Sequence, residues 1–569
     1  MTDPAVQLRD VSYRYRDQQG LALKDISLDV APGEFVAVLG PTGAGKSTLA
    51  ALTNGLVPHY FKGTFQGDVT VLGTNTRTTG VAGFAALVGL VFQDFEAQLF
   101  STSVELEVAF GPENLGVPRD EIARRVEKML AMVGLSPLKG RHPSTLSGGQ
   151  KQRLAIASVL ALEPRVLVMD EPTTDLDPVG KAEVFDLRDR IRQEGDLTLL
   201  MIEHETEELL NADRVLLVRD GQVAALGPAG DILRRVEVLD DMGLMVPGIP
   251  AYFHRMEADE LPLTPEEGVQ AFGALGWRIA EEPYKRLLDE DRRRMQGCGD
   301  VVIRCEGLRH QYEGGVFALD GIDLELRRGE MVALVGRNGG GKTTLVKHFN
   351  GLLMPTDGEV AVNGQATARQ GVFELGKTVG YVFQNPDHQI FSETVFDEVA
   401  FSLRLRGEHE EEIRQRVAAS LDAVGLSGME KEDPFGLDRS GRKRVAVASV
   451  LAAGPEVLVL DEPTTGLDYA GQRNMMEMVR RLNREGGSTV VFITHHMWVV
   501  AEYAHRVVVV SDGHVLMDDS PRAVFSRPDV MREARLKPPH IVELSSRLGT
   551  TLLTVDEMVA CTRTGRDEP

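Results

Sequence analysis

Two stretches of this sequence have the residue types and spacing of a phosphate-binding loop. GPTGAGKST (40–48) and GRNGGGKTT (336–344) both match Gly-x-x-x-x-Gly-Lys-[Ser/Thr]. In such a loop glycines let backbone amides wrap phosphate oxygens at a helix start, the lysine adds positive charge, and the next hydroxyl holds Mg²⁺. The candidate nucleotide-binding residues of these loops are Gly40, Gly43, Gly45, Lys46, Ser47, Thr48, Gly336, Gly339, Gly341, Lys342, Thr343 and Thr344.

Two pairs of acids follow apolar runs further along the chain, in VLVMDEPTTDLD (166–177) and VLVLDEPTTGLD (457–468). Asp170 and Asp461 suit a second contact to Mg²⁺ beside Ser47 and Thr343. Glu171 and Glu462 are placed to polarise a water for in-line attack on a γ-phosphate. An acidic strand end that faces solvent is the alternative interpretation, and the paired glycine loops disfavour it.

Two histidines and two glutamines also occupy matching places. His204 and His495 each lie 33 positions after their glutamate and follow an apolar run, and we expect them to contact the γ-phosphate. Gln93 and Gln384 each follow a Val-Phe pair, and we expect them to ligate Mg²⁺ and to sense the γ-phosphate. A lone histidine would more often be a core residue, so the matched placement carries this interpretation.

Tyr15 and Tyr312 lie near the start of the two glycine-loop regions. An aromatic ring there could stack on adenine. Packing in the core explains a tyrosine at these positions nearly as well, so both interpretations stay open.

These motifs lie in a tandem duplication, with an offset of 296 residues at the glycine loops and 291 at the later motifs. Short apolar runs precede each motif and alternate with helical stretches, which predicts the buried parallel strands of an α/β fold. The Asp-Gly turns in VRDGQV (218–223) and VSDGHV (510–515) predict an antiparallel edge on each sheet.

The duplication predicts the domain organisation. Thr264 with Glu267 and Thr554 with Glu557 both fit a capping box, which indicates a small tail subdomain after each copy. The charged segment 277–299 is expected to be a solvated connector. The expected divisions are 1–235 (first copy), 236–276 (first tail), 277–299 (linker), 300–527 (second copy) and 528–569 (second tail).

Composition narrows the class of protein. With 569 residues, 43% hydrophobic and 26% charged, the chain is typical of a globular protein of two or more domains. No apolar run reaches the roughly 18–20 residues of a spanning helix, so the chain itself is expected in the cytoplasm. The formal charge of −23 disfavours nucleic acid as a partner. The spacing of Cys298, Cys305 and Cys561 disfavours zinc and iron–sulfur sites.

LSGGQ (146–150) lies between Gln93 and Asp170, and with the other motifs it resembles the ATP-binding cassette (ABC) family. The resemblance covers nearly all of both copies and implies P-loop ATPase domains that contain a helical subdomain. It also implies that two cassettes enclose each ATP between the glycine loop of one and the LSGGQ segment of the other. Ser147, Gly148, Gly149 and Gln150 would then contact the nucleotide held by Lys342, and the two copies in one chain would pair with each other.

The second copy has LDRSG (437–441) where the first has LSGGQ. Both leucines lie 53 positions after their glutamine, so the alignment needs no gap. Asp438, Arg439 and Ser440 would contact the nucleotide held by Lys46. Asp438 would face a phosphate of like charge, at a cost of up to roughly 4 kcal/mol for each pair of unit charges about 4 Å apart. We therefore expect that site to bind ATP but to hydrolyse it slowly.

A narrower resemblance concerns 88–116 and 379–401, which look like the region after the glutamine in energy-coupling factor transporter ATPases. Those ATPases power cobalt, nickel and vitamin importers, and this region receives arginine-bearing helices of a transmembrane subunit. Glu105, Glu107, Asp397 and Glu398 could accept such arginines, or could belong to an exposed helix face. The sequence departs from the pattern at Asp94-Phe95, where the second copy keeps Asn385-Pro386.

The resemblance favours the ATPase subunit of a micronutrient importer that hydrolyses ATP at the cytoplasmic membrane face. Its expected partners are a transmembrane coupling subunit and a substrate-binding membrane subunit. The ATPase of a sugar ABC importer is a second interpretation, and the motif FQ-x-x-x-x-Q-[Leu/Ile]-Phe favours the first. A soluble ABC protein acting on ribosomes or DNA is a third, which the acidic charge and the cysteine spacing oppose.

Overall fold

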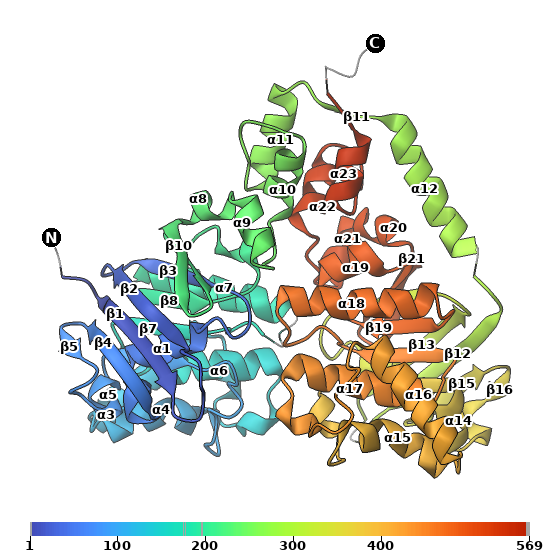
Figure 1. The fold of residues 1–569 in the computed structure, drawn as a ribbon, viewed down its shortest axis with the longest axis horizontal. Coiled ribbons are helices and arrows are strands. Elements are labelled where there is room, and N and C mark those ends of the chain that lie inside the picture. The colour runs from blue at the N-terminus through green and yellow to red at the C-terminus, as the bar shows by residue number, and fades with distance from the viewer. Residues whose placement is uncertain are drawn as a thin grey trace. The chain divides into compact units, whose positions relative to one another are not determined.

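The computed structural model describes residues 3–174, 176, 178–194, 197–296, 298–313 and 315–564. The chain divides into two compact units, 1–250 and 251–569. Each unit contains α/β layers with helices against twisted sheets (Figure 1).

A six-stranded sheet forms the centre of the first unit, in the order β10-β9-β3-β8-β7-β6. The strands from β9 to β6 pair in parallel and only β10 pairs antiparallel, which confirms the edge predicted from the Asp-Gly turn. β3, β7 and β8 are buried at every position, as expected for parallel strands covered on both faces. The strands are β3 (Phe35–Leu39), β6 (Val88–Val91), β7 (Val166–Asp170), β8 (Thr198–Ile202), β9 (Arg214–Arg219) and β10 (Gln222–Pro228).

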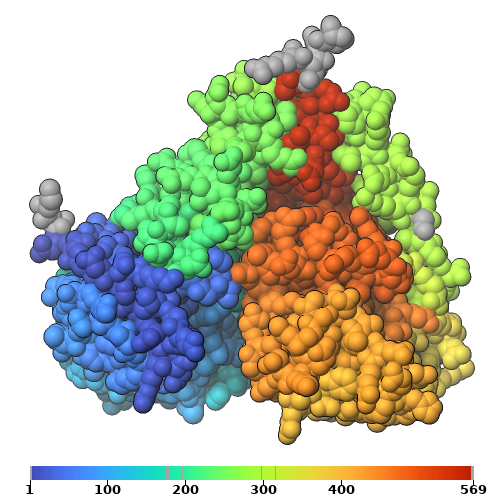
Figure 2. Space-filling view, in the orientation of Figure 1, coloured from blue at the N-terminus to red at the C-terminus, as the bar shows by residue number. Residues whose placement is uncertain are grey.

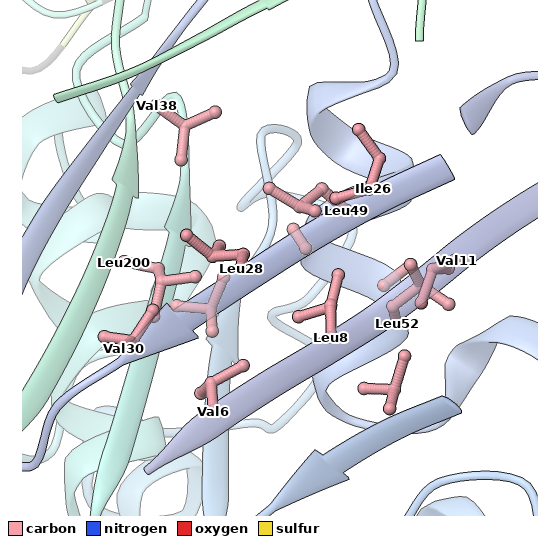
Figure 3. Close-up of a cluster of buried hydrophobic side chains, with 14 of the residues drawn as sticks. Val6, Leu8, Val11, Ile26, Leu28, Val30, Val38, Leu49, Leu52 and Leu200 are labelled. Atoms are coloured by element: carbon pink, nitrogen blue, oxygen red, sulfur yellow. The ribbon is translucent and has the colours of Figure 1, made fainter. Parts of the chain in front are cut away.

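An antiparallel sheet in the order β2-β1-β4-β5 lies beside it. The strands are β1 (Val6–Tyr15), β2 (Leu23–Val30), β4 (Gly63–Val71) and β5 (Thr74–Asn75). Figure 3 shows how its apolar side chains meet those of α1 and of the central sheet in one core. The residues that Figure 3 labels are Val6, Leu8, Val11, Ile26, Leu28, Val30, Val38, Leu49, Leu52 and Leu200, each at most 2% exposed.

Helices connect the strands of the first unit, and α4, α5 and α6 pack together as a helical subdomain. The helices are α1 (Lys46–Thr53), α2 (Leu56–His59), α3 (Val81–Phe84), α4 (Val104–Asn114), α5 (Arg119–Met132), α6 (Gly148–Leu160), α7 (Pro178–Glu194), α8 (Ala229–Leu233) and α9 (Val236–Asp241). α10 (Gly248–Arg255) crosses the boundary between the units.

The second unit repeats both sheets, in the orders β17-β18-β19-β14-β20-β21 and β13-β12-β15-β16. Again only the last strand of the central sheet, β21, pairs antiparallel. The strands are β12 (Val301–Gln311), β13 (Phe317–Arg327), β14 (Met331–Val335), β15 (Asp357–Val362), β16 (Gln365–Ala366), β17 (Val379–Val382), β18 (Val457–Asp461), β19 (Thr489–Ile493), β20 (Arg506–Ser511) and β21 (His514–Asp519).

The helices of the second unit include a helical subdomain of α15, α16 and α17. They are α11 (Pro265–Ala274), α12 (Glu281–Gln296), α13 (Lys342–Phe349), α14 (Val372–Thr378), α15 (Val395–Leu405), α16 (Glu410–Ala423), α17 (Arg439–Ala452), α18 (Tyr469–Arg484), α19 (Met497–Tyr503), α20 (Pro521–Phe525), α21 (Pro528–Glu533), α22 (His540–Arg547) and α23 (Val555–Cys561). Among the described residues, no helix combines the length and the apolar character that crossing a bilayer requires.

The second unit contains residues 251–276 of the first tail together with the second tail. β11 (Arg278–Ile279) pairs antiparallel with β22 (Thr562–Arg563), and α11 packs on α22. The boundary at Pro250 therefore falls inside the segment 236–276 that the sequence marks as the first tail. The linker helix α12 has no buried residue and runs along the surface of this unit (Figures 1 and 2).

The two predicted capping boxes form only in part. The Thr264 and Thr554 hydroxyls accept hydrogen bonds from the Glu267 and Glu557 amides at 3.2 Å, as predicted. The two glutamates, however, accept from the amide one residue before the cap, at 2.9 Å and 2.6 Å, rather than from the cap residue itself. The sequence pattern therefore identifies the helix starts but not the second half of the motif.

Candidate active sites

The two glycine loops fold as the sequence predicts, each between a central strand and a helix that begins at the lysine. Gly45 and Gly341 adopt φ values of 101° and 104°, and a Cβ at either position would lie 2.5 Å from a carbonyl oxygen. Only glycine fits such a position without strain. Lys46 Nζ donates to the carbonyls of residues 40 and 41, at 2.8 Å and 3.0 Å. Lys342 makes the same pair of bonds at 2.7 Å and 2.8 Å.

The carboxylate pairs stand at the ends of β7 and β18. Asp170 and Asp461 are the last residues of these strands, and the glutamates that follow have φ values of 48° and 49°. Few non-glycine residues adopt this left-handed conformation. The Glu171 and Glu462 amides donate to the carbonyls of Ile202 and Ile493, both at 3.1 Å, so the adjacent strand helps to hold the unusual turn.

In the first copy the predicted catalytic residues lie together. His204 Nε2 is 2.7 Å from Glu171 Oε1, and Gln93 Nε2 donates to Glu171 Oε2 at 2.7 Å. Thr174 donates to the same Oε2 atom at 3.2 Å. Burial alone would raise the pKa of Glu171, but the hydrogen bond and charge of His204 lower it below its usual range. This glutamate is therefore held as a carboxylate.

The second copy has a related but different arrangement. Gln384 Nε2 and the Thr465 hydroxyl both donate to Glu462 Oε2 at 2.9 Å, and His495 Nδ1 lies 3.5 Å from it. Although burial opposes the charged form, the nearby His495 lowers the pKa of Glu462 to about 2. The histidine thus uses a different ring nitrogen and stands farther from its glutamate than in the first copy.

The two aspartates also differ in their surroundings. In the second copy Asp461 Oδ2 accepts hydrogen bonds from the hydroxyls of Thr343 at 3.1 Å and Tyr381 at 2.7 Å. In the first copy Leu90 replaces this tyrosine, and Asp170 Oδ1 is buried without a hydrogen-bond partner. Burial raises the pKa of Asp170 to about 6, although a hydrogen bond from Ser47 opposes the rise.

The candidate adenine-stacking tyrosines lie at the helices that start at the lysines. Their hydroxyls pair with the hydroxyls of Thr48 and Thr344, at 3.0 Å from Tyr15 and 3.1 Å from Tyr312. Tyr312 is 46% exposed, so its ring is accessible to a ligand. Stacking on adenine stays a prediction.

LSGGQ and LDRSG both begin a helix of the helical subdomain. Ser147 caps α6 through a capping box with Gln150, whose side chain accepts from the Ser147 amide at 3.0 Å. Asp438 caps α17 by a single hydrogen bond, which its side chain accepts from the Gly441 amide at 2.6 Å. The aspartate thus preserves the helix start of the second copy and puts a negative charge where the first copy has a hydroxyl.

Two of the four acids proposed for partner contacts have a different role. Glu107 is 3% exposed and accepts from the amides of Phe100 and Ser101, at 3.1 Å and 2.7 Å. Glu398 is 4% exposed and holds the amides of Phe391 and Ser392 in the same way, at 3.1 Å and 3.0 Å. These buried carboxylates are occupied by backbone donors, which contradicts the expectation that they accept a partner's arginines.

The other two acids are accessible but already have ion-pair partners. Glu105 lies 3.2 Å from Lys139, and Asp397 lies 2.8 Å from Arg404. Exposed aromatic pairs lie on the same helices and the loops before them: Phe100 contacts Phe110, and Phe391 contacts Phe401, with ring centroids 4.5 Å and 4.8 Å apart.

Sequence reasoning missed two residues of the second site, Tyr381 and Lys443. The Tyr381 hydroxyl on β17 donates to Asp461, and Lys443 on α17 donates to the backbone carbonyl of Glu462. The sequence signal for both is a difference between the copies, because the first copy has Leu90 and Gln152 at these positions. A comparison of the copies position by position could therefore have identified them.

The glycine loops, strand-end carboxylates and parallel sheets together define two P-loop ATPase domains. A family model described as ABC transporter matches residues 23–174 and 319–465. A second model, described as AAA domain, putative AbiEii toxin, Type IV TA system, matches residues 440–501 within the second copy. The chain belongs to the ABC transporter family of ATPases and contains two cassettes. Its enzymatic activity is therefore the ATP hydrolysis of an ABC transporter.

Relatives align with this chain over nearly the whole of both copies. A protein of Caldanaerobacter subterraneus subsp. tengcongensis, provisionally named as an ABC transporter ATP-binding protein, is 53% identical over 99% of this chain and 100% of its own length. A Methanosarcina mazei protein with the same provisional name is 41% identical, over 95% of this chain and 92% of its own. A solved structure, cbiO1 from Clostridium perfringens, described as part of the ABC transporter complex cbiONQ, is 36% identical. It covers 43% of this chain and 99% of its own, with a TM-score of 0.39.

Proposed function

We propose that this chain powers the import of a micronutrient, a vitamin or a transition-metal ion, through a separate membrane complex, with one hydrolytic and one degenerate ATP site. The motif FQ-x-x-x-x-Q-[Leu/Ile]-Phe in both copies supports an importer of the energy-coupling factor type. The exposed aromatic pairs beside Glu105 and Asp397 offer a surface for a transmembrane coupling subunit, itself joined to a substrate-binding membrane subunit. The chain would then act peripherally, at the cytoplasmic membrane face.

Each ATP would be enclosed between the two copies. The nucleotide at Lys342 would meet Ser147, Gly148, Gly149 and Gln150, whereas the nucleotide at Lys46 would meet Asp438, Arg439 and Ser440. The observation that carries the asymmetry is the pair of helix caps, a hydroxyl at α6 and a carboxylate at α17. A γ-phosphate that approaches α17 meets a like charge already seated at the helix start, where a phosphate would otherwise be favoured.

Mg²⁺ fits both sites. The buried Asp170 Oδ1 lacks a hydrogen-bond partner, and the Thr343 hydroxyl lies 3.1 Å from Asp461, so hard oxygen donors are gathered as this ion prefers. Ser47, Asp170 and Gln93 would hold it in the first copy, and Thr343, Asp461 and Gln384 in the second. When bound, Mg²⁺ supplies positive charge against the phosphate oxygens.

The chain's own residues account for the rest of the reaction. The glycine-loop amides and Lys46 or Lys342 position the phosphates. Glu171 or Glu462, held as a carboxylate, orients a water and accepts its proton as the oxygen attacks the γ-phosphorus in line. His204 and His495 would turn from the glutamate to the γ-phosphate when ATP is present.

The experiment measures steady-state ATP hydrolysis of purified Glu171→Gln and Glu462→Gln variants. Loss of a general base costs roughly 10²–10⁴ in rate, so Glu462→Gln should lower kcat by about 10². Glu171→Gln should lower it by less than about threefold, since that site contributes little turnover. Nucleotide binding by both variants is the control. If Glu171→Gln is the more damaging change, the assignment of the hydrolytic site is wrong.

Copurification tests the two alternative functions, the sugar importer and the soluble factor that acts on ribosomes or DNA. A small polytopic membrane protein recovered from a detergent extract supports transport, and recovery of RNA or ribosomal proteins contradicts it. The cargo of the recovered membrane partner then distinguishes a micronutrient from a sugar.

A further inference from the structure

In the second copy, a buried lysine hydrogen-bonds the backbone of the loop that carries Glu462. The lysine lies in α17, the helix that begins in the LDRSG segment, and the loop (462–466, the catalytic loop) follows β18. Lys443, in the second turn of α17, is 3% exposed. Its Nζ donates to the carbonyl of Glu462 at 2.9 Å and to that of Pro463 at 3.2 Å. The loop after β18 is therefore tied to α17 at the residue that carries the catalytic carboxylate.

This contact acts on a backbone that needs support. Glu462 has φ 49°, and a bulky residue keeps that left-handed conformation only where its surroundings impose it. The Glu462 amide is held by Ile493 from β19, and its carbonyl is held by Lys443. The orientation of the peptide groups on either side of Glu462 sets the direction of its side chain, so Lys443 bears directly on where the carboxylate points.

A second residue of α17 reaches the same loop. A Cβ at Gly466 would lie 2.3 Å from Cζ of Arg439, so the guanidinium lies directly against this glycine. Gly466 has φ 70°, which glycine adopts without strain. Arg439, which sequence analysis assigned to the nucleotide of the other site, therefore packs on the catalytic loop of its own copy. Both ends of the 462–466 loop touch α17.

Neither contact is present among the residues of the first copy that the structure describes. Gln152 occupies the position of Lys443 and is fully buried, but its side-chain amide nitrogen and oxygen both lack hydrogen-bond partners. A Cβ at Gly148, the counterpart of Arg439, would meet nothing within 4 Å. Glu171 nevertheless keeps φ 48°. The fold of the loop does not require the lysine, so its presence in the second copy needs another explanation.

We propose that Lys443 is a positioning residue for ATP hydrolysis at Glu462. Through Lys443 and Arg439, the helix that begins with the degenerate segment fixes the catalytic loop of its own copy. A change at the start of α17, where the nucleotide held by Lys46 would bind, can thereby reach Glu462. The inference rests on the proposed function in one respect, that turnover runs mainly through Glu462.

The test isolates each site with a glutamate substitution in the full chain. In the Glu171→Gln background, where Glu462 supplies the turnover, Lys443→Gln introduces the side chain of the first copy. We expect kcat to fall about tenfold, because small misplacements of a reacting group are costly, and KM for ATP to change less than about twofold. Lys443→Arg, which keeps charged donors, should recover at least half of kcat. Gln152→Met is the matched control and should stay within about twofold of its background.

The Glu462→Gln background separates this inference from the proposed function. There, Lys443→Gln should reduce the residual turnover no further, because the loop it positions no longer carries the base. If Glu171→Gln alone abolishes turnover, the assignment of the hydrolytic site fails, whatever Lys443 does. Unchanged kcat for Lys443→Gln in the Glu171→Gln background overturns the inference. So does a loss that Lys443→Arg does not restore, or a loss in kcat that is accompanied by an equal weakening of ATP binding.

Discussion

His310 and His348 place two imidazole rings in the interior of the second copy, where the first copy has Tyr13 and Leu52. His348 Nδ1 donates to the Thr344 carbonyl at 2.8 Å, so in the neutral ring Nε2 is an acceptor. His310 Nδ1 lies 3.1 Å from that Nε2 atom and 3.2 Å from the Met354 carbonyl, and one proton on His310 satisfies this geometry. A proton on His348 Nε2 would set two donors against each other.

This arrangement predicts a pH-dependent stability. Burial lowers the pKa of His348, and the facing His310 adds to the effect, whereas the unfolded chain titrates near its usual value of about 6.5. Below that pH the unfolded state binds more protons, so stability is lost as the pH falls. When the pH falls from 8 to 5.5, the unfolding free energy should decrease in both proteins. The decrease should be about 1 kcal/mol smaller for His348→Leu than for the unsubstituted protein.

Fluorescence during urea unfolding measures this difference, because both tryptophans of the chain, Trp277 and Trp498, lie in the second unit. His514→Gln, at an exposed histidine, is the control and should leave the pH dependence unchanged. Equal losses for His348→Leu and the unsubstituted protein would show that His348 takes up its proton in the folded state.

At the scale of elements, α4 and α15 each use a buried glutamate to hold the loop that precedes them. In α15 the Glu398 carboxylate accepts two backbone amides, whereas its neighbour Asp397 is exposed and paired with Arg404. Glu398→Ala leaves two buried donors unpaired and should lower the unfolding free energy by about 2–4 kcal/mol. Asp397→Ala removes an exposed ion pair and should cost less than about 1 kcal/mol. Urea unfolding of the two variants checks the order, and a larger loss for Asp397→Ala would contradict it.

Most elements and most of the site were predictable because their signals are local. An apolar run, a glycine loop and a strand-end carboxylate each lie within a few residues, and their repetition at a fixed offset removes most ambiguity. Glu107 and Glu398 failed because an acid in the first turn of a helix looks exposed in the sequence, and only the folded loop shows what it binds. Lys443 was missed because its partners, the carbonyls of Glu462 and Pro463, lie about twenty positions away and carry no side-chain signal.

On the scale of the whole chain, the least predictable feature is that residues 251–276 of the first tail join the second unit. Their position depends on contacts that span some 300 residues of sequence, such as the 2.8 Å hydrogen bond between Tyr252 and Thr562. Arg255 pairs with Asp556, and Glu266 lies 2.6 Å from Arg547. A capping motif can locate the helices of each tail, but it carries no information about which other tail they pack against.

These contacts predict that the chain stays together when it is cut between α12 and β12. Cleavage at a specific protease site inserted between Gln296 and Val301 would break the covalent connection between the two copies. The first tail would stay attached to the first copy. The buried Tyr252 side chain, the β11–β22 pairing and the α11–α22 packing should still hold the fragments together, so they should coelute in size-exclusion chromatography without nucleotide.

Truncating Tyr252 tests whether the tails supply this association. Replacing a fully buried aromatic residue by alanine costs about 3–5 kcal/mol, which weakens an association constant by at least about 10². Cleaved Tyr252→Ala protein should therefore separate into fragments at concentrations where the cleaved unsubstituted protein remains whole. Leu275→Ala, at a 45% exposed residue just after α11, is the control and should still coelute. Separation of the cleaved unsubstituted protein would mean that the covalent linker, and not the paired tails, keeps the two ATPase domains together.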